Sequence, residues 1–324
     1  MAGEETLNLT DIGIQQQILL ADHGLDRQGH RRSQTDDISL LKSASDTRYL
    51  LMQESAFACD DKGVFLLSID DIHALHLDMS AALFIGLQPA ICDGSIFAIK
   101  ANSDQLLSQL KWVTLRELAV KVSRPMANLL ATAQALLIWH DNHRYCSRCG
   151  HVTDLTLAGH GRRCGDSACA CDVYPRIDPA IIVLVTNNDQ CLLARGSTWS
   201  EKRFSCLAGF VEVGESIEDA VKREVYEEVG LRLDEVRYQA SQPWPFPQSL
   251  MLGFYAVTRE HALTFHDGEI AEAHWYNAGQ LEETIRHGEL LISSSLSISF
   301  QLLDHWYLQQ TGDRLVHLLS SLSP

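Results

Sequence analysis

Short apolar runs alternate with glycine and aspartate turn signals between residues 48 and 100. The runs RYLLM, GVFLLSI, ALFIGL and SIFAIK have the length and spacing of strands in a small, mostly antiparallel sheet. Two helices are predicted to follow, over about residues 114–122 and 125–142, because Pro125 suits a first turn and the second segment has a long apolar face. We expect Trp139 and His140, at the end of this helix, to pack in the interior and not to bind a ligand.

The pattern changes at Tyr174, where PRIDP leads into AIIVLV, an apolar run typical of a buried strand. Further strands are predicted at CLLAR, LMLGFYAV and EAHWY, and helices over about residues 277–287 and 297–309, while FSCLAGF leads into a loop. Residues 1–46 are polar and have no recognisable motif, so we expect them to include a mobile segment. The chain therefore divides into residues 1–46, an N-terminal domain over 47–143, a cysteine-rich segment over 144–173 and a second domain over 174–324.

One helix between these strands has an unusual polar pattern. Ser216 followed by Asp219 resembles a capping box, and Gly230 can close a helix in the left-handed conformation, which predicts a helix over residues 217–229. At about 100° per residue, Glu224 and Glu228 project into the middle of its apolar sector. That sector is formed by Ile217, Ala220, Val221, Val225 and Val229, and Glu227 lies at its edge.

Carboxylates on a face that should pack are unfavourable unless a positive charge lies against them. Arg223 can neutralise one of them but not all three. Mg²⁺ or Mn²⁺ is the natural compensation, because hard cations bind carboxylates, retain waters and take further ligands from a phosphate. The pattern therefore favours a metal platform for phosphate chemistry, and the alternative is a solvated acidic helix.

Composition limits the classes of function. The chain has 324 residues, 46% of them hydrophobic, and a net charge of −16, which disfavours non-specific binding to nucleic acid or to an anionic membrane. Its first residues lack the basic and apolar regions of a secretion signal, and no apolar run approaches the length of a membrane span. We expect a soluble, cytoplasmic protein.

Five of the nine cysteines lie between residues 146 and 171. Cys146 and Cys149 are separated by two residues, and Cys164 follows a short segment that resembles a hairpin. Such pairs indicate a zinc ribbon with a closed, structural Zn²⁺ in a reducing compartment. The fourth ligand is open between Cys169 and Cys171. We expect the cysteines outside this segment to be small buried side chains, namely Cys59, Cys92, Cys191 and Cys206.

The segment SQPWPFPQS, residues 241–249, has prolines at three alternate positions. Proline excludes a helix and favours an extended, polyproline-like path, which would direct the rings of Trp244 and Phe246 to one side. These rings could stack on flat bases, or they could fill a gap in the core.

The run from Gly209 to Leu231 resembles the Nudix hydrolase signature at every fixed position. Five residues separate Gly209 from Glu215 and seven separate Glu215 from REV, after which EE and GL follow at intervals of one residue. The resemblance implies an α/β/α sandwich with the loop, the helix and a second loop at its active site. It also implies hydrolysis of a nucleoside diphosphate linked to another moiety.

With the zinc ribbon and the SQPWPFPQS segment, the chain is similar to the NADH pyrophosphatase subfamily. The similarity extends from about Thr114 to the EAHWY segment and is weak before residue 110. It implies a mixed α/β (α+β) protein in which a small N-terminal domain and a zinc ribbon precede the Nudix domain. It further implies a homodimer that cleaves NADH or NAD⁺ to nicotinamide mononucleotide and AMP.

The resemblance also assigns residues to the site. Metal ligands for Mg²⁺ or Mn²⁺ would be Ala208 through its carbonyl, Glu224, Glu228 and Glu269, although Glu272 competes with Glu269. Glu227 or Glu228 would activate water, and Arg223 would hold the carboxylates. Cys169, at the subfamily's distance from Pro175, would complete the zinc ligands. Substrate contacts would be Arg116, Tyr174, Gln242, Pro243, Trp244, Pro245, Phe246, Pro247, Gln248, Ser249 and Ser299, the last at a position where the subfamily more often has alanine.

The sequence predicts NADH hydrolysis at phosphorus and leaves two alternatives. The same chemistry could remove the NAD cap from RNA 5′ ends, although the acidic charge disfavours high RNA affinity. A protein that senses NAD or ADP-ribose without turnover would be expected to have an eroded carboxylate set, and here the set is complete.

Overall fold

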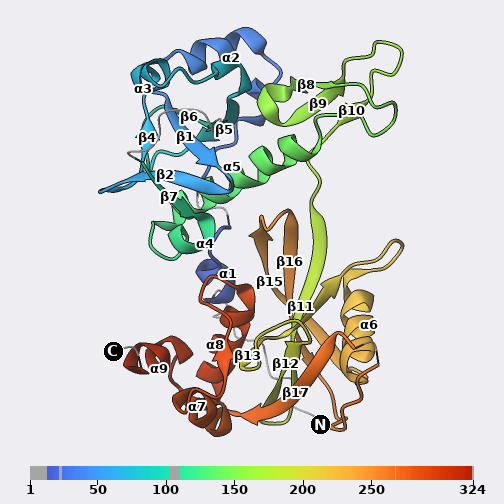
Figure 1. Ribbon diagram of the computed structural model, residues 1–324. Coiled ribbons are helices and arrows are strands. Elements are labelled where there is room, and N and C mark those ends of the chain that lie inside the picture. The colour runs from blue at the N-terminus through green and yellow to red at the C-terminus, as the bar shows by residue number, and fades with distance from the viewer. Residues whose placement is uncertain (1–12, 22–23, 102–109, 267, 323–324) are drawn as a thin grey trace, which may run out of the picture. The chain divides into compact units, whose positions relative to one another are not determined.

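The computed structural model describes residues 13–21, 24–101, 110–266 and 268–322. The chain forms two compact units, coloured along the sequence in Figure 1. The first comprises Met1–Ile18, Asp178–Gln242 and Leu250–Pro324, and the second comprises Leu19–Ile177 and Pro243–Ser249.

The second unit contains a seven-stranded sheet with the order β3-β2-β1-β6-β5, in which β4 also pairs with β1 and β7 with β2. Every described pair is antiparallel except β1 with β6, so the prediction of a mostly antiparallel sheet is confirmed. The strands are β1 Arg48–Gln53, β2 Ala56–Asp60, β3 Gly63–Val64, β4 Leu66–Leu67, β5 Leu83–Leu87, β6 Ser95–Lys100 and β7 Lys111–Thr114.

Three helices accompany this sheet after its first strands: α3 Ile69–Ala74, α4 Leu115–Leu118 and α5 Arg124–Asn142. The predicted helix over about residues 114–122 is only the short α4. It ends early because the chain must turn before Ser123, whose side chain caps α5 by accepting a hydrogen bond from the backbone N–H of Met126. Trp139 is 2% and His140 is 9% exposed, which confirms that both pack in the interior.

The polar N-terminal segment contributes one helix to each unit. α1 Gly13–Gln17 belongs to the first, where the side-chain amide of Gln15 exchanges two hydrogen bonds with the backbone of Ser241. α2 Thr35–Lys42, preceded by the 3-10 turn Gly29–Arg31, belongs to the second and buries Ile38 in its core. These two short helices were not predicted, because each buries a single residue, Ile14 or Ile38, and neither has a long helical period.

The cysteine-rich segment forms a three-stranded antiparallel sheet of β8 Thr153–Thr156, β9 Gly161–Cys164 and β10 Asp172–Val173. A 3-10 turn, η3 Leu157–Gly159, joins β8 to β9 and packs on β5. Gly159 has φ +97°, and a Cβ there would lie 2.6 Å from Leu83 Cδ2, so only glycine permits this close approach. The ring of His160 also hydrogen bonds to the carbonyl of Phe84.

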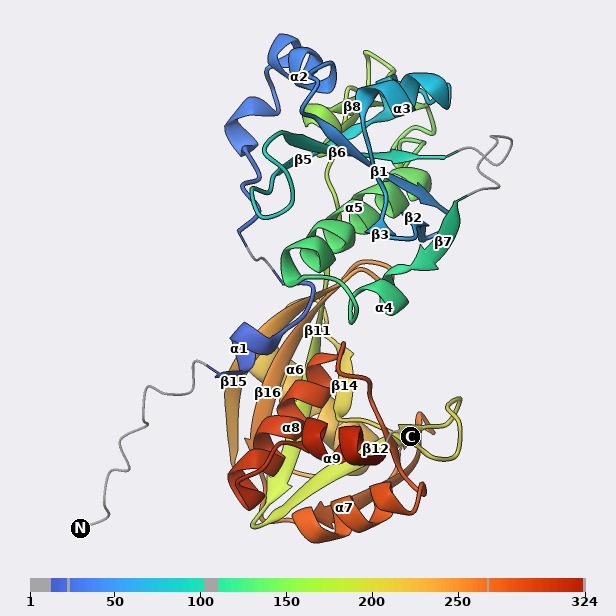
Figure 2. The ribbon, with the colours of Figure 1, turned by 90° about the vertical axis from the view of Figure 1, so that its left-hand side faces the viewer.

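The first unit is built on a six-stranded sheet with the order β15-β16-β11-β12-β17, in which β14 also pairs with β11. β11 buries Ile181, Val183 and Val185 in one core with α6, while α8 also packs on this strand, and Figures 1 and 2 show the two helices on opposite faces of the sheet. The predicted α/β/α sandwich is therefore present. The strands of the six-stranded sheet are β11 Asp178–Asn187, β12 Gln190–Gly196, β14 Leu207–Phe210, β15 Glu235–Trp244, β16 Ser249–Val257 and β17 Ile270–Asn277. A separate two-stranded parallel sheet is formed by β13 Arg203–Phe204 and β18 Leu291–Ile292. The later helices of this unit are α6 Ile217–Val229, α7 Ala278–Arg286, α8 Ile298–Thr311 and α9 Leu315–Leu322.

The proline-rich segment differs from the polyproline-like path predicted for it. Ser241 to Trp244 continue β15, residues 245–248 form a turn, and Ser249 begins β16. The chain reverses here because β15 and β16 are hydrogen-bonded neighbours in the sheet. Strand pairing therefore prevails over the local preference of the prolines.

Candidate active site

The predicted helix over residues 217–229 is α6, with the same bounds. The side chain of Ser216 accepts a hydrogen bond from the backbone N–H of Asp219, and Gly230 closes the helix at φ 75°. Glu228 is only 5% exposed, on the face that packs against the sheet. The side chains of Glu224 and Glu227 are 13% and 51% exposed, so the three carboxylates differ in their access to water.

β14 lies directly against the Glu224 carboxylate. A Cβ added to Gly209 would lie 1.9 Å from Glu224 Cδ, an impossible distance. The signature therefore needs glycine at this position, because any larger residue would displace the carboxylate from the helix face. On the same strand, Leu207 is buried in the core. Its neighbour Ala208 is exposed and lines the cavity described below.

Arg223 holds the acidic residues together. Its Nε and Nη2 donate to the two carboxylate oxygens of Glu215 at 2.8 and 2.9 Å, and Nη2 also donates to the carbonyl of Phe210. Its Nη1 lies 2.9 Å from an oxygen of Glu224 and from one of Glu227. The bidentate pair with Glu215 and the further carboxylates of Glu227 and Glu224 keep the pKa of Arg223 above its ordinary value, against the opposing effect of burial.

Burial raises the pKa of Glu224, and the charges of Glu227 and Glu269 raise it further, against the opposing effect of Arg223. The hydrogen bonds from Arg223 lower the pKa of Glu215. The arrangement thus concentrates more negative charge at Glu224 than its one arginine neutralises. A divalent cation would relieve this excess, so the residues present fit a hard metal ion.

A cavity of about 350 Å³ lies beside α6 in the first unit. Its lining includes the carboxylates Glu228 and Glu269, the exposed Ala208 and the partly exposed ring of Trp199. In the part of the chain that the structure describes, the acidic ligand atoms do not all gather within 4.8 Å, since Glu224 is turned to Arg223.

The structure separates Glu269 from Glu272. Glu272 pairs with Arg195, opposite it on β12, at 2.6 Å and also contacts His274 at 3.2 Å. Both of its carboxylate oxygens are therefore engaged outside the cavity lining. This geometry supports Glu269 as the acidic residue contributed by the segment before β17.

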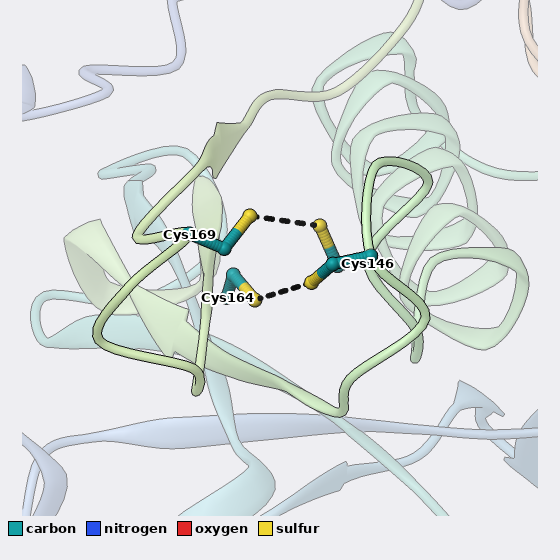
Figure 3. Close-up of side chains that lie close together, drawn as sticks. Cys146, Cys164 and Cys169 are labelled. Carbon is teal, nitrogen blue, oxygen red and sulfur yellow. Dashed lines mark hydrogen bonds between the residues drawn. The ribbon is translucent and has the colours of Figure 1, made fainter.

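The cysteine-rich segment with β8, β9 and β10, called the ribbon below, brings four cysteines together (Figure 3). The Sγ atoms of Cys146, Cys149, Cys164 and Cys169 all lie within 4.8 Å of one another. Cys146 and Cys169 are 3.9 Å apart, and Cys149 and Cys164 are 3.3 Å apart. Backbone N–H groups of Arg148 and Cys149 lower the pKa of Cys146 to about 6, which favours the thiolate. Four sulfurs at these distances fit a closed, structural Zn²⁺ site.

Cys171 lies outside this group, with its Sγ 3.6 Å from the carbonyl of Asp172. Of the remaining cysteines, Cys59, Cys191 and Cys206 are buried as predicted, whereas Cys92 is only partly buried.

The second unit brings Arg116 onto the proline-rich turn. The Arg116 guanidinium lies 3.8 Å from the centre of the Phe246 ring and 5.2 Å from that of Trp244. The two rings contact each other edge to face, 5.0 Å apart, and Gln134 donates a hydrogen bond to the carbonyl of Pro245. Arg116, Trp244 and Phe246 therefore form one cationic and aromatic group. Of these three, Arg116 and Phe246 line a cavity of about 330 Å³ together with Thr114 and Ile138.

Two predicted substrate contacts are buried in the first unit. Gln242 is 0% exposed, and its amide donates to the carbonyl of Leu296 and accepts from the N–H of Ile298. Ser299 is 3% exposed, and its hydroxyl hydrogen bonds to Ser205 and to the N–H of Cys206. Both side chains therefore hydrogen bond to backbone groups of neighbouring segments and hold those segments in place. Tyr174, by contrast, is 60% exposed in the second unit.

Two features of the site were missed from the sequence. Glu215 was recognised only as a signature position, although it is the main partner of Arg223. Trp199 lies in a loop between β12 and β13, where no hydrophobic period could reveal that its side chain lines the cavity.

Three family profiles match successive parts of the chain. Residues 39–139 match the NADH pyrophosphatase-like rudimentary NUDIX domain, residues 141–174 match the NADH pyrophosphatase zinc ribbon domain and residues 176–292 match the NUDIX domain. Within the described residues, no helix is long and apolar enough to cross a membrane.

Among curated proteins, a relative in Mycobacterium bovis (strain BCG / Pasteur 1173P2) named NAD-capped RNA hydrolase NudC is 42% identical over 204 residues, which cover 60% of this chain and 64% of the relative. The human protein named NAD-capped RNA hydrolase NUDT12 is 37% identical over 56% of this chain and 41% of its own length. Each alignment thus spans less than two thirds of the relative. Among solved structures, a NUDIX hydrolase from Nitrosomonas europaea is 18% identical with a TM-score of 0.42, covering 53% of this chain and 94% of that one.

Proposed function

Because this chain belongs to the Nudix family and combines its Nudix domain with the zinc ribbon and N-terminal domain of NADH pyrophosphatases, we propose that it hydrolyses the diphosphate bond of NADH or NAD⁺. The products would be reduced or oxidised nicotinamide mononucleotide and AMP. One observation carries this proposal: the carboxylates of Glu224, Glu227 and Glu228 lie on one helix, with Arg223 joining the helix to Glu215 and to β14.

The proposed ligands for Mg²⁺ or Mn²⁺ are Glu224, Glu228, Glu269 and the carbonyl of Ala208. A divalent cation bound there would neutralise charge on the phosphoryl oxygens. Glu227 or Glu228 orients the attacking water and accepts its proton. Arg223 fixes the position of these carboxylates through the loop that contains Glu215.

For the substrate, we propose that Arg116 and Tyr174 act with the segment 243–249 in orienting the dinucleotide. The exposed edge of the Arg116, Trp244 and Phe246 group offers both a charge and aromatic surface. Gln242 and Ser299 contribute indirectly, because their polar atoms hold the backbone at the start of α8 and beside β14.

Three further properties belong to this proposal. Zn²⁺ bound by Cys146, Cys149, Cys164 and Cys169 stabilises the ribbon, and the protein acts as a homodimer in the cytoplasm. The close approach of these free thiols is compatible with a reducing compartment. Sedimentation of the zinc-loaded protein tests the dimer, since a monomer at micromolar concentration would contradict it.

Product analysis tests the reaction. With Mg²⁺ or Mn²⁺, NADH should give reduced nicotinamide mononucleotide and AMP, and EDTA should stop the reaction. Trp244→Ala and Phe246→Ala should raise KM more than they lower kcat. Release of free nicotinamide with ADP-ribose would refute hydrolysis at phosphorus, and tight NADH binding without turnover would favour a sensor.

A second substrate is favoured by the names of the relatives, which are NAD-capped RNA hydrolases. We propose NAD-capped RNA as an alternative substrate, because the same diphosphate bond would be broken. Side-by-side values of kcat/KM for NADH, NAD⁺, ADP-ribose and NAD-capped RNA decide between free and RNA-linked dinucleotide.

A further inference from the structure

A second cavity, of about 500 Å³, lies in the second unit between α2 and the ribbon. Arg32 and Lys42 line it from the α2 side, and Arg163, Asp172 and Tyr174 line it from the ribbon side. The contacts of η3 with β5, together with the hydrogen bond from His160 to the carbonyl of Phe84, hold the ribbon against the sheet in this unit. The cavity is therefore part of a single packed body.

Two cations in this cavity have no carboxylate partner within 4 Å among the described residues. Lys42 Nζ donates to the backbone carbonyl of Met79, and Arg32 Nη2 donates to the carbonyl of Arg27, both at 3.0 Å. Arg32 Nε is buried without an acceptor. By contrast, the neighbouring Arg163 pairs with Asp172 at 2.6 Å, which shows that acidic partners occur on the same walls.

Burial lowers the pKa values of both Arg32 and Lys42, and the nearby charge of Arg27 lowers that of Arg32 further. Asp78 partly offsets the effect at Lys42, but its carboxylate accepts a hydrogen bond from the N–H of Ser80. Partly buried cations without a counter-charge are unfavourable. This arrangement stands out in a chain with a net charge of −16. A bound anion would supply the missing counter-charge.

The other lining residues indicate what kind of anion fits. Ser33, Thr35 and Ser39 also line the cavity, and hydroxyl groups can donate hydrogen bonds to the oxygens of a phosphate. Leu155 and Leu157, whose side chains are partly exposed, supply apolar surface on the ribbon side. The cavity volume lies within the range of small-molecule sites.

We propose that this cavity binds a nucleoside monophosphate, with the phosphate monoester between Arg32 and Lys42 and the nucleoside against the wall that contains Leu155 and Leu157. The Nudix carboxylates lie in the first unit, whereas this cavity lies in the second. Its ligand needs no divalent cation, because the protein itself supplies the positive charge.

Calorimetric titration of the full-length, zinc-loaded protein with AMP tests the proposal. Divalent cations are omitted so that the metal-dependent chemistry is silent. AMP should bind at least about tenfold more tightly than adenosine or inorganic phosphate, because each of these lacks half of the recognised chemistry. Equal affinity for AMP and inorganic phosphate would overturn the nucleoside assignment, and equal affinity for AMP and adenosine would overturn the phosphate assignment.

Variants locate the binding. Arg32→Gln with Lys42→Gln should weaken AMP binding by about tenfold or more, whereas Lys42→Arg, which keeps the charge, should weaken it less than about threefold. Lys121→Gln, at an exposed lysine of the same unit, is the matched control. Zinc content and circular dichroism confirm that each variant is folded. AMP affinity that is unchanged in the folded double variant would overturn the site, whatever the outcome for NADH hydrolysis.

Discussion

Glu224, Glu227 and Glu228 of α6 lie within five positions of one another, yet their environments differ. Glu228 is buried, Glu224 is nearly buried against Gly209 and Arg223, and Glu227 is half exposed. A buried carboxylate is suited to binding a cation at a fixed position, and a half-exposed one can exchange protons with water. We therefore expect the effects of substitution to differ along this one helix.

Glu228→Gln should lower kcat by about a hundredfold or more, because the amide has a similar shape but cannot serve as an anionic ligand or base. Steady-state kinetics with NADH and Mg²⁺ measures the loss, and circular dichroism checks the fold. Glu218→Gln, on the exposed side of the first turn of α6, makes the same chemical change away from the cavity and should leave kcat unchanged. If both variants remain fully active, the proposed centre is wrong.

At the scale of elements, two kinds of interaction stabilise the ribbon. Its four converging thiols fit zinc, and its turn η3 packs on β5 of the neighbouring sheet. His140 hydrogen bonds to the carbonyl of Gly159 and His160 to that of Phe84, so both imidazoles lie at this packing surface. The ribbon should therefore be sensitive to the loss of metal and to acid.

The fourth zinc ligand can be tested by two substitutions two residues apart. Cys169→Ser should abolish retention of one zinc per chain after dialysis, because a serine hydroxyl is a poor ligand and only three thiolates remain. Cys171→Ser should retain zinc, since its sulfur contacts the carbonyl of Asp172 instead. Atomic absorption measures both. Zinc lost in Cys171→Ser alone would reverse the assignment.

Acid should weaken the junction between ribbon and sheet. Burial lowers the pKa values of His140 and His160 to about 4, below the value of 6.5 for a free imidazole. Between pH 6.5 and about 4 the unfolded chain binds more protons, so the stability conferred by neutral imidazoles is present above pH 6.5 and lost as the pH falls. The midpoint of thermal unfolding should therefore fall over this window.

His160→Gln should make that fall shallower, because glutamine does not titrate, whereas His73→Gln, at an exposed position on α3, should leave the profile as it is. Zinc content is measured at each pH so that metal loss is not mistaken for protonation of the imidazole. Identical profiles for wild type and His160→Gln would exclude this histidine as a source of acid sensitivity.

At the scale of the whole molecule, the net charge of −16 bears on the choice between small and polymeric substrates. A polyanion that binds through many phosphate contacts displaces counterions and loses affinity steeply with salt. An acidic protein with a few local cations, such as Arg116 and the pair Arg32 and Lys42, offers little basis for such contacts.

Hydrolysis of NAD-capped RNA should therefore depend weakly on salt. Between about 50 and 200 mM monovalent salt, we expect the ratio of kcat/KM for capped RNA to that for NADH to change less than about tenfold, or to rise as repulsion is screened. NADH at each salt concentration controls for general effects on the catalytic domain. A decrease of about a thousandfold in this ratio would reveal an extended phosphate-binding surface.

The sequence by itself determined features that depend on neighbouring residues. A serine cap, a closing glycine and a helical period gave α6 with its observed bounds, because these signals act within a few positions of each other. Apolar runs located most strands of the Nudix domain for the same reason. The cysteine spacing and the Nudix signature narrowed the chemistry further, through resemblance to a known family.

The tertiary structure decided which of these residues meet and which are withdrawn from solvent. Strand pairing turned residues 245–248 back into β16, and it set Glu272 opposite Arg195 while Glu269 lines the cavity. Burial made Gln242 and Ser299 backbone partners, although their sequence positions suggested substrate contacts. The cavity containing Arg32 and Lys42 depends on segments more than a hundred residues apart along the chain. Such pairings rest on packing and long-range hydrogen bonds, which local sequence periods do not record.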